Sequence, residues 1–139
     1  MTDEYAQEVY SLGMSTKQLQ VYEDRPAYYS VDSIKEAIKS DSEVCLVALV
    51  DGKFAGFMLT HINPVFGEAY FSDLAIKPEF RGQNIGSKLF DRTDEILKGK
   101  KIDWSWGLVH EDNEQMQRIM EKRGFVKGRK FIFYVREAN

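Results

Sequence analysis

Hydrophobic residues recur at helical spacing in the first third of this chain. Between residues 2 and 12 they return every three or four positions, which predicts a first helix that ends at Gly13. The stretch 15–29 predicts a short helical turn followed by a loop. Ser33, with Glu36 three residues later, forms a capping box. A second helix is therefore expected to begin directly after Ser33, which serves as its cap.

The middle of the chain has the patterns of strands. Residues 44–50 are an unbroken apolar run, typical of a strand that is covered on both faces. Asp51-Gly52 is a strong signal for a two-residue hairpin turn, so residues 53–60 should return as the antiparallel partner. Residues 69–76 predict a third strand. Together these three strands should form an antiparallel meander.

The last third of the chain alternates between helix and strand. A helix is predicted over 86–98, a strand over 102–109, a second helix over 113–123 and a final hairpin over 125–135. Because a strand that follows a helix usually joins its sheet through a right-handed crossover, the strand at 102–109 should be parallel to its neighbour. The expected fold is α/β, with a mixed, mostly antiparallel sheet of about six strands and about four helices in one domain, residues 1–139.

Charge and composition exclude several classes of protein. The net charge of −3 argues against a general nucleic-acid binder, which would carry a basic stripe. No apolar run approaches the length of a membrane span, and the first residues lack the parts of a secretory signal, so a cytoplasmic location is expected. A single cysteine, Cys45, cannot form an internal disulfide, and with only His61 and His110 there is no convincing metal site.

A loop with two glycines lies between the third predicted strand and the next helix. The strand should stop at Pro78, and Gly82 and Gly86 follow before the helix. This order gathers main-chain N–H groups at the positive end of a helix dipole, which is a place to hold phosphates. A Walker loop does not fit, because only three residues separate the glycines and Ser87 precedes Lys88.

Two blocks of sequence resemble a known family. Residues 81–86, Arg-Gly-Gln-Asn-Ile-Gly, follow the run Leu-Ala-Ile-Lys-Pro-Glu-Phe at 74–80 and resemble the acyl-CoA signature of the GNAT superfamily of N-acetyltransferases. Residues 113–125 resemble that family's later motif, an Asn followed by a helix that ends in Glu-Lys-x-Gly-Phe. The blocks stand in the family's order and at about its separation. The resemblance covers roughly residues 44–135.

This resemblance implies a reaction and a site. It implies transfer of an acetyl group from acetyl-CoA to a primary amine, by direct attack in a ternary complex and without a metal. The family fold implies a splayed strand pair, here around Leu74 and Leu108, with the pantetheine arm between the two strands and the pyrophosphate on the glycine loop. The cofactor-binding residues that it implies are Leu74, Ala75, Ile76, Arg81, Gly82, Gln83, Asn84, Ile85, Gly86, Ser87 and Asn113.

The reaction also needs groups that move protons. An attacking amine must be neutral, so a general base, directly or through water, is useful. Asp73 on the third strand is one candidate, and a carboxylate satisfied by neighbouring backbone is the alternative. Glu111 and His110, just past the strand at 102–109, are further candidates, with simple exposure as the alternative.

Two positions depart from the family pattern. Asn84 replaces a glycine, and Asn tolerates the left-handed region better than other residues do. Met120 stands where many members carry a Tyr that protonates the leaving thiolate, so the usual general acid is absent. Tyr134 is a candidate to replace it.

Several alternatives stay open at this stage. The acceptor is expected to be a small-molecule amine; a protein N-terminus or lysine, or a non-catalytic domain that binds acyl-CoA, are the alternatives. Tyrosines in the region 18–30 could line an acceptor pocket or merely pack. The family's first strand has no counterpart before the first helix, so that strand is expected to be absent or replaced, for example by a second copy, unless the reading frame begins upstream. Either a monomer or a homodimer is compatible with the sequence.

Overall fold

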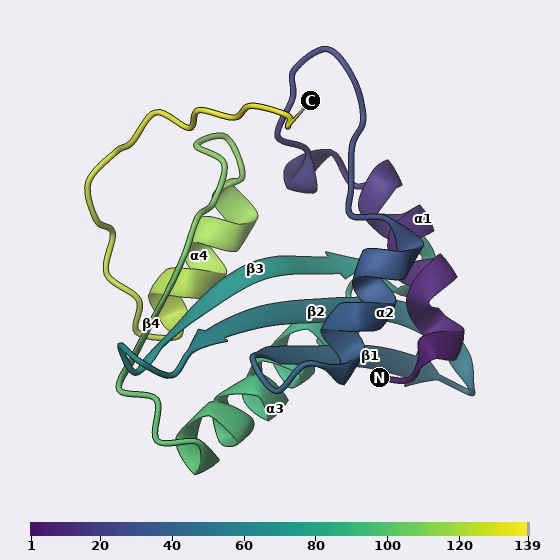
Figure 1. Cartoon of the computed structure of the whole chain (residues 1–139), viewed down its shortest axis with the longest axis horizontal. Coiled ribbons are helices and arrows are strands. Elements are labelled where there is room, and N and C mark those ends of the chain that lie inside the picture. Colours follow the sequence, from purple (N-terminus) through teal and green to yellow (C-terminus); the bar gives the residue numbers. More distant parts are fainter. Residues whose placement is uncertain (139) are drawn as a thin grey trace.

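The computed structural model describes residues 1–138 and shows a sheet of four strands in the order β1-β2-β3-β4 with helices on both faces (Figure 1). The strands are β1 (Glu43–Val50), β2 (Lys53–Asn63), β3 (Glu68–Ile76) and β4 (Trp104–Gly107). The α-helices are α1 (Ala6–Ser15), α2 (Val31–Lys39), α3 (Ile85–Gly99) and α4 (Glu114–Lys122), and short 3-10 turns lie at Asp3–Tyr5, Lys17–Leu19 and Pro78–Phe80.

The predicted antiparallel meander is confirmed. β1 pairs with β2 and β2 with β3, both antiparallel. Asp51 and Gly52 both have positive φ, at 51° and 78°, which is the geometry of a tight hairpin turn whose twist matches the strands. β4 then joins β3 in parallel, as the crossover through α3 predicted.

Two hydrophobic cores lie on opposite faces of the sheet. Alternate residues of β2 point to alternate faces, so Phe57 packs under α1 and α2 while Met58 packs under α3. The apolar sides of α3 and α4 complete the second core. Neither face could be buried by the sheet alone, which is why the helices divide between the two sides.

Both helix boundaries predicted near the N-terminus need correction. Gly13 does not end α1, which continues to Ser15. The reason for a glycine here is packing, because the ring of Tyr28 occupies the space that a side chain at position 13 would fill. α2 begins three residues earlier than predicted, since Ser30 and not Ser33 is the cap. The Ser30 hydroxyl accepts a hydrogen bond of 3.1 Å from the main-chain N–H of Ser33.

The sheet has four strands among the described residues and not about six. The predicted final hairpin is wrong: residues 125–138 form neither helix nor strand, because strand-forming residues become a strand only against a partner edge. The strand predicted over 102–109 is shorter in the structure, where β4 spans only Trp104–Gly107. β1 is largely half-buried, because it lies at an edge of the sheet. Residues 1–5 do not pair with the sheet and contain only the 3-10 turn at Asp3–Tyr5.

Candidate functional site

The loop between β3 and α3 presents unpaired main-chain donors. β3 ends at Ile76, a 3-10 turn follows, and α3 begins at Ile85. In residues 1–138 the main-chain N–H groups from Gly82 to Ser87 have no hydrogen-bond acceptor in the protein. Asn84, at the cap position, makes no side-chain capping bond. The positive end of α3 is therefore left open to an external anion.

The conformation of this loop explains two of its residues. Gly82 has φ of +82°, where a side chain would be strained. Asn84 has φ of 59°, the left-handed region that Asn tolerates, so its replacement of the family's glycine preserves the local backbone. Gly86 differs, because a Cβ atom there would meet only Leu74, at 3.7 Å, an ordinary contact. The fold itself therefore does not require glycine at position 86.

Arg81 lies at the start of the same loop. Its Nε donates a long hydrogen bond of 3.4 Å to the carbonyl oxygen of Ile76, while the side chain stays exposed. This contact holds a cationic side chain next to the free N–H groups, at the end of β3. The loop thus combines helix-end donors with a positive charge.

β3 extends beyond its pairing with β4, which ends at Gly107. They pair only from Glu68 to Phe71 on β3, opposite Trp104 to Gly107 on β4. β3 continues to Ile76 without a partner on that side among the described residues. The predicted splaying of the chain around Leu74 and Leu108 stays a prediction, and the free stretch of β3 carries Leu74, Ala75 and Ile76.

A β-bulge directs Asp73 to the face of the sheet that α1 and α2 cover. β2 and β3 shift register at Ser72, so that Leu59 lies opposite Asp73 while Thr60 lies opposite Phe71. The Ser72 hydroxyl donates a 3.1 Å hydrogen bond to the carbonyl oxygen of Leu59 and stabilises the irregularity. Because directly opposite residues share a face, Asp73 points to the same side as Leu59.

The charge of Asp73 acts on three tyrosines, Tyr28, Tyr29 and Tyr70. We call these residues, together with Asp73 and with Trp106, which stacks on Tyr70, the acid–aromatic cluster. Tyr28 and Tyr29 come from the loop before α2, with ring centres 5.0 Å apart. Tyr70 on β3 stacks on Trp106 of β4, with ring centres 4.3 Å apart. The cluster thus gathers side chains from two strands and a loop that are far apart in sequence.

The carboxyl group of Asp73 has a raised pKa. Burial raises the pKa of Asp73 to about 6, although the nearby hydroxyl groups of Ser72 and Tyr28 lower it. Burial together with the charge of Asp73 raises the pKa of Tyr28, and the same two causes raise the pKa of Tyr29 to about 12. Asp73 Oδ2 and the Tyr28 hydroxyl are buried without a partner in the described structure that meets hydrogen-bond geometry. Such a carboxyl has unused hydrogen-bonding capacity.

A second carboxylate, that of Glu43, lies on the same face of the sheet. Glu43 of β1 and Tyr70 of β3 are both neighbours of His61 on β2 in the strand register. The Glu43 carboxylate and His61 Nδ1 are 2.6 Å apart. Neighbouring strands lie about 5 Å apart, so the main chain at Glu43 on β1 lies roughly 10 Å from the main chain at Tyr70 on β3. Its negative charge also raises the pKa of Asp73.

The other predicted site residues have different surroundings. The Asn113 side chain caps α4 by accepting a 3.3 Å hydrogen bond from the N–H of Met116. Glu111 is exposed in the loop before that helix. Tyr134 is 85% exposed in the C-terminal segment, so the structure does not bring it together with Asp73.

Met120 and Cys45 are packed within the protein. Met120 packs into the core beneath β4, where its methyl group would lie 3.3 Å from a Cβ at Gly107. Cys45 is half-buried in β1, and burial raises the pKa of its thiol to about 11, which makes it an unreactive thiol. Neither side chain offers an acid for the reaction.

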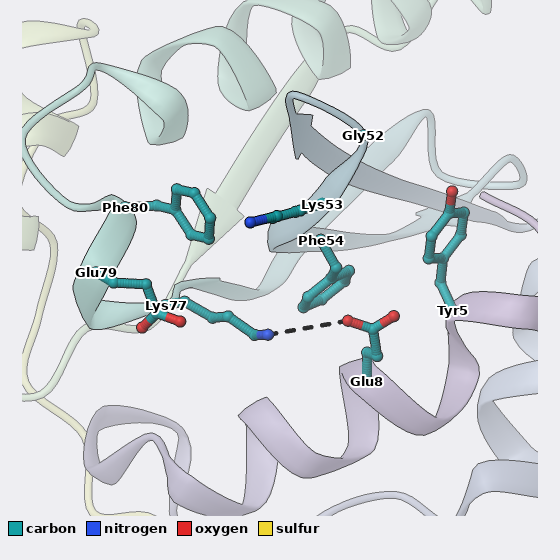
Figure 2. A pocket seen from close by; sticks show the side chains of 8 residues that line it. All are labelled: Tyr5, Glu8, Gly52, Lys53, Phe54, Lys77, Glu79 and Phe80. Atoms are coloured by element: carbon teal, nitrogen blue, oxygen red, sulfur yellow. Dashed lines mark ion pairs between the residues drawn. The ribbon is translucent and has the colours of Figure 1, made fainter.

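A separate hollow lies between α1, the β1–β2 turn and the turn that follows β3 (Figure 2). Figure 2 shows Lys77 and Glu8 pointing toward each other across it, with their charged atoms 3.9 Å apart, beside the ring of Phe54. The residues that line it include neither Asp73 nor the loop from Gly82 to Ser87. Because Lys77 and Glu8 already pair with each other and the hollow is separate from that loop and from Asp73, we do not place the site here.

Two other kinds of site were sought over residues 1–138. No group of three or more His, Cys, Asp or Glu side chains in that range is placed to hold a metal ion. Within the same range, every helix is too short or too polar to cross a membrane.

The sequence predicted the loop and Asp73 but missed most of the acid–aromatic cluster. Tyr28 and Tyr29 were noted only as residues that could line a pocket or pack. Tyr70 gave no signal, since it stands in an ordinary strand pattern, and the sequence predicts Trp106 only as part of the core or of a pocket wall. Their positions opposite each other depend on the register of a parallel pair, which the sequence does not specify.

Comparison with known proteins finds similarity to one family. Residues 5–125 match the model of the acetyltransferase (GNAT) family. An acetyltransferase of Pectobacterium atrosepticum is 29% identical over 89 residues, which are 64% of this chain and 62% of that protein. A Bacillus subtilis protein, named as a candidate ribosomal protein bS18-alanine N-acetyltransferase, is 35% identical over 83 residues, 60% of this chain and 54% of that protein. The chain therefore spans less than two thirds of the length of both relatives.

A solved structure shows the same fold. The PaiA N-acetyltransferase of Thermoplasma acidophilum, crystallised in complex with coenzyme A, aligns with a TM-score of 0.78 and 21% identity, over 91% of this chain and 86% of that one. The likeness covers the sheet and the helices on both of its faces.

Proposed function

Because this chain belongs to the acetyltransferase (GNAT) family, we propose that it is an N-acetyltransferase that moves an acetyl group from acetyl-CoA to a primary amine. One observation carries the proposal: the free main-chain N–H groups from Gly82 to Ser87 lie directly after the unpaired stretch of β3. A diphosphate and an extended arm need these two features side by side.

The residues present fit coenzyme A. The N–H groups at the start of α3 would bind the pyrophosphate, and Arg81 would add a positive charge beside it. The free edge of β3 at Leu74, Ala75 and Ile76 would hydrogen-bond the amides of the pantetheine arm, as a further strand would. Asn113 would contribute through the side-chain N–H groups that its capping bond leaves available. When bound, acetyl-CoA supplies the activated acetyl group.

Asp73 is the base that the structure supports best. A lysine-like amine with an ordinary pKa of about 10.4 costs roughly 4 to 5 kcal/mol to deprotonate at pH 7. With its pKa raised to about 6, Asp73 is ionised at pH 7 and is a stronger proton acceptor than an ordinary aspartate. Its unpartnered Oδ2 leaves an oxygen available for the proton, directly or through water. Glu111 and Tyr134 stay predictions, since both side chains are exposed.

The acid–aromatic cluster supports a small organic cation as the acceptor. Aromatic faces attract ammonium groups, and the carboxylates of Asp73 and Glu43 stand on one side of the sheet. A molecule with more than one amine could place one nitrogen near Asp73 and a second, protonated nitrogen near Glu43. Aliphatic diamines and aminoglycosides have this character.

A protein N-terminus is the second candidate acceptor. The observation in its favour is the 35% identity with the Bacillus subtilis relative that is named as a candidate ribosomal protein bS18-alanine N-acetyltransferase. An N-terminal amine is also a cation, so the cluster by itself does not exclude it. A domain that binds acyl-CoA without turnover is the third candidate.

One experiment separates these functions. Release of coenzyme A thiol would be measured with acetyl-CoA and three acceptors: an aliphatic diamine, an aminoglycoside and a peptide that begins with alanine. Saturable release with a small amine, reduced in Asp73→Asn, supports the proposal. Release with the peptide alone makes the chain an N-terminal acetyltransferase. Binding of acetyl-CoA without thiol release in any arm overturns the catalytic assignment.

A further inference from the structure

The hollow in Figure 2 has the size of a small-molecule site. Its volume is about 470 Å³, and it lies between α1, the β1–β2 turn and the 3-10 turn Pro78–Phe80. Pockets that bind small molecules commonly measure about 300 to 1,000 Å³. Neither the Asp73 carboxylate nor the loop from Gly82 to Ser87 belongs to its lining, so a molecule bound here would leave both available.

Aromatic rings form the apolar part of the hollow. The ring of Phe54 is buried, at 4% exposure, and Tyr5 stacks on it with ring centres 6.3 Å apart. Phe80 belongs to the 3-10 turn and is half-buried. Figure 2 shows the Lys53 side chain reaching into the space between the rings of Phe54 and Phe80. These rings offer an apolar surface to a ligand side chain.

Two of the four charges that line the hollow have no ion-pair partner within residues 1–138. Lys77 is engaged, because its ammonium lies 3.9 Å from the Glu8 carboxylate and 5.5 Å from the centre of the Phe54 ring. Lys53 and Glu79 form no ion pair in that range. With two lysines and two glutamates the lining is neutral overall. A free cation and a free anion in a neutral lining match a molecule that carries one charge of each sign.

We propose that this hollow binds a free amino acid with an aromatic or branched apolar side chain. The carboxylate of the amino acid would pair with Lys53 and its ammonium with Glu79, while its side chain would lie against the rings of Phe54 and Phe80. Lys53 and Glu79 are both exposed, so their long side chains can adjust to the short distance between the two charges of an amino acid.

Other classes of small molecule match the lining less well. A molecule with several negative charges would be repelled by Glu8 and Glu79, and one with several positive charges by Lys53 and Lys77. A purely apolar molecule would remove water from charged groups without replacing their hydrogen bonds. A zwitterion with an apolar side chain avoids all three costs.

The hollow adjoins the turn that precedes Arg81. The Phe80 N–H donates a 3.0 Å hydrogen bond to the carbonyl oxygen of Lys77, and the Arg81 N–H donates one of 3.3 Å to that of Pro78. A ligand that contacts Glu79 and Phe80 would hold this turn on one side, and the pyrophosphate would hold Arg81 on the other. This coupling rests on the proposed function. The amino acid and acetyl-CoA should each raise the affinity for the other, because coupling between two binding sites is reciprocal.

Calorimetry with phenylalanine and with leucine tests the site without turnover. In the absence of acetyl-CoA, at least one of these amino acids should bind saturably at one molecule per chain. Removal of the ammonium (the N-acetyl derivative), of the carboxylate (phenethylamine or isopentylamine) or of the side chain (glycine) should each weaken binding by at least about tenfold. Saturable binding of neither phenylalanine nor leucine overturns the site.

Substitutions locate the binding in the hollow. Lys53→Gln and Glu79→Gln should each lower the affinity for the amino acid by at least about tenfold, and both side chains are exposed, so the fold should be kept. Lys98→Gln and Glu36→Gln, exposed and outside the hollow, are the matched controls and should bind as the wild type does. Asp73→Asn should also bind the amino acid normally. Binding that is lost in Asp73→Asn but kept in Lys53→Gln would place the amino acid in the acid–aromatic cluster and overturn the proposal.

The same titrations measure the coupling. Saturating amino acid should raise the affinity for acetyl-CoA by at least about fivefold in the wild type and leave it unchanged in Lys53→Gln. Equal affinity with and without the amino acid overturns the coupling. A chain that binds the amino acid but not acetyl-CoA would refute the proposed function and leave the site in the hollow standing, so the two failures are distinguishable.

Discussion

The ring of Tyr28 lies against Gly13 of α1, in the space where the Cβ atom of any other residue would stand. The same ring packs edge-on against Phe57 of β2, with ring centres 6.2 Å apart. Through this contact a helix, a strand and the loop before α2 together fix one wall of the acid–aromatic cluster. A glycine that resembles a helix end in the sequence is therefore part of the site's support.

Gly13→Ala should destabilise the protein. Alanine favours helix by up to about 1 kcal/mol over glycine, but displacing the Tyr28 ring costs about 1 to 3 kcal/mol, so the steric cost wins. The midpoint of thermal unfolding should fall. Gly99→Ala is the matched control, because it stands in α3 with nothing within 4 Å of the added methyl group, and it should be neutral or stabilising. Equal effects of the two substitutions would contradict this account.

Asp73→Asn should stabilise the protein at neutral pH and remove activity. A carboxyl whose pKa is raised to about 6 holds its proton more tightly in the folded state than in the unfolded chain. The wild-type free energy of unfolding therefore falls as pH rises from about 4 to about 6, and then stays level. At pH 8 the variant should be more stable by up to roughly 3 kcal/mol, and below pH 4 the difference should vanish. Denaturant unfolding at several pH values measures this, with exposed Asp41→Asn as the control.

The same group should set the pH dependence of the reaction. If Asp73 accepts the proton, kcat/KM of the wild type should rise through an apparent pKa near 6. Asp73→Asn should lower kcat/KM by at least about 100-fold while the affinity for acetyl-CoA stays within about twofold. A full rate in the variant would assign the base elsewhere, for which Glu111→Gln is the next substitution.

Gly86→Val should abolish coenzyme A binding without unfolding the protein. The Cβ atom has room beside Leu74, so the cost to folding is small, while the branched side chain stands among the N–H groups that we assign to the pyrophosphate. Calorimetry should show affinity reduced by at least about 100-fold, which corresponds to about 3 kcal/mol. Gly99→Val, at the far end of the same helix, is the control. Unchanged affinity in Gly86→Val would refute the loop assignment.

Trp106→Ala should weaken acceptor binding alone. It removes the ring that stacks on Tyr70, 4.3 Å away, but no group that we place on coenzyme A. An aromatic face is worth about 1 to 2 kcal/mol to a desolvated cation, so KM for the amine should rise about 5- to 30-fold. KM for acetyl-CoA should stay the same. Trp104→Ala, on the same strand and 55% exposed, is the matched control.

Arg123→Ala should loosen α4 from α3. The Arg123 guanidinium lies 2.7 Å from Asp91 and 2.9 Å from Asp94, over the ring of Phe90, and its side chain is 18% exposed. Losing a partly buried cation shared by two carboxylates should cost about 1 to 3 kcal/mol of unfolding free energy. Arg92→Ala, which removes an exposed pair with Glu95, should cost less than about 0.5 kcal/mol. Chemical denaturation measures both.

Local chemistry along the chain determined the meander, the crossover and the glycine loop between β3 and α3. The Asp51-Gly52 turn, the stop at Pro78 and the spacing of Gly82 and Gly86 each act over a few neighbouring residues, so their consequences can be derived without the fold. Asn84 is an example: its tolerance of positive φ was expected from its side chain and is observed.

Only the tertiary structure decided what surrounds Asp73 and where the C-terminal run lies. The bulge at Ser72, the ring of Tyr28 against Gly13 and the stack of Tyr70 on Trp106 depend on register and packing between distant segments. The apolar run at 131–135 has the composition of a strand, yet a strand exists only where another main chain offers its edge. The residue types at 131–135 therefore determine only a preference for strand, and whether a strand forms depends on a partner edge that the tertiary structure has to provide.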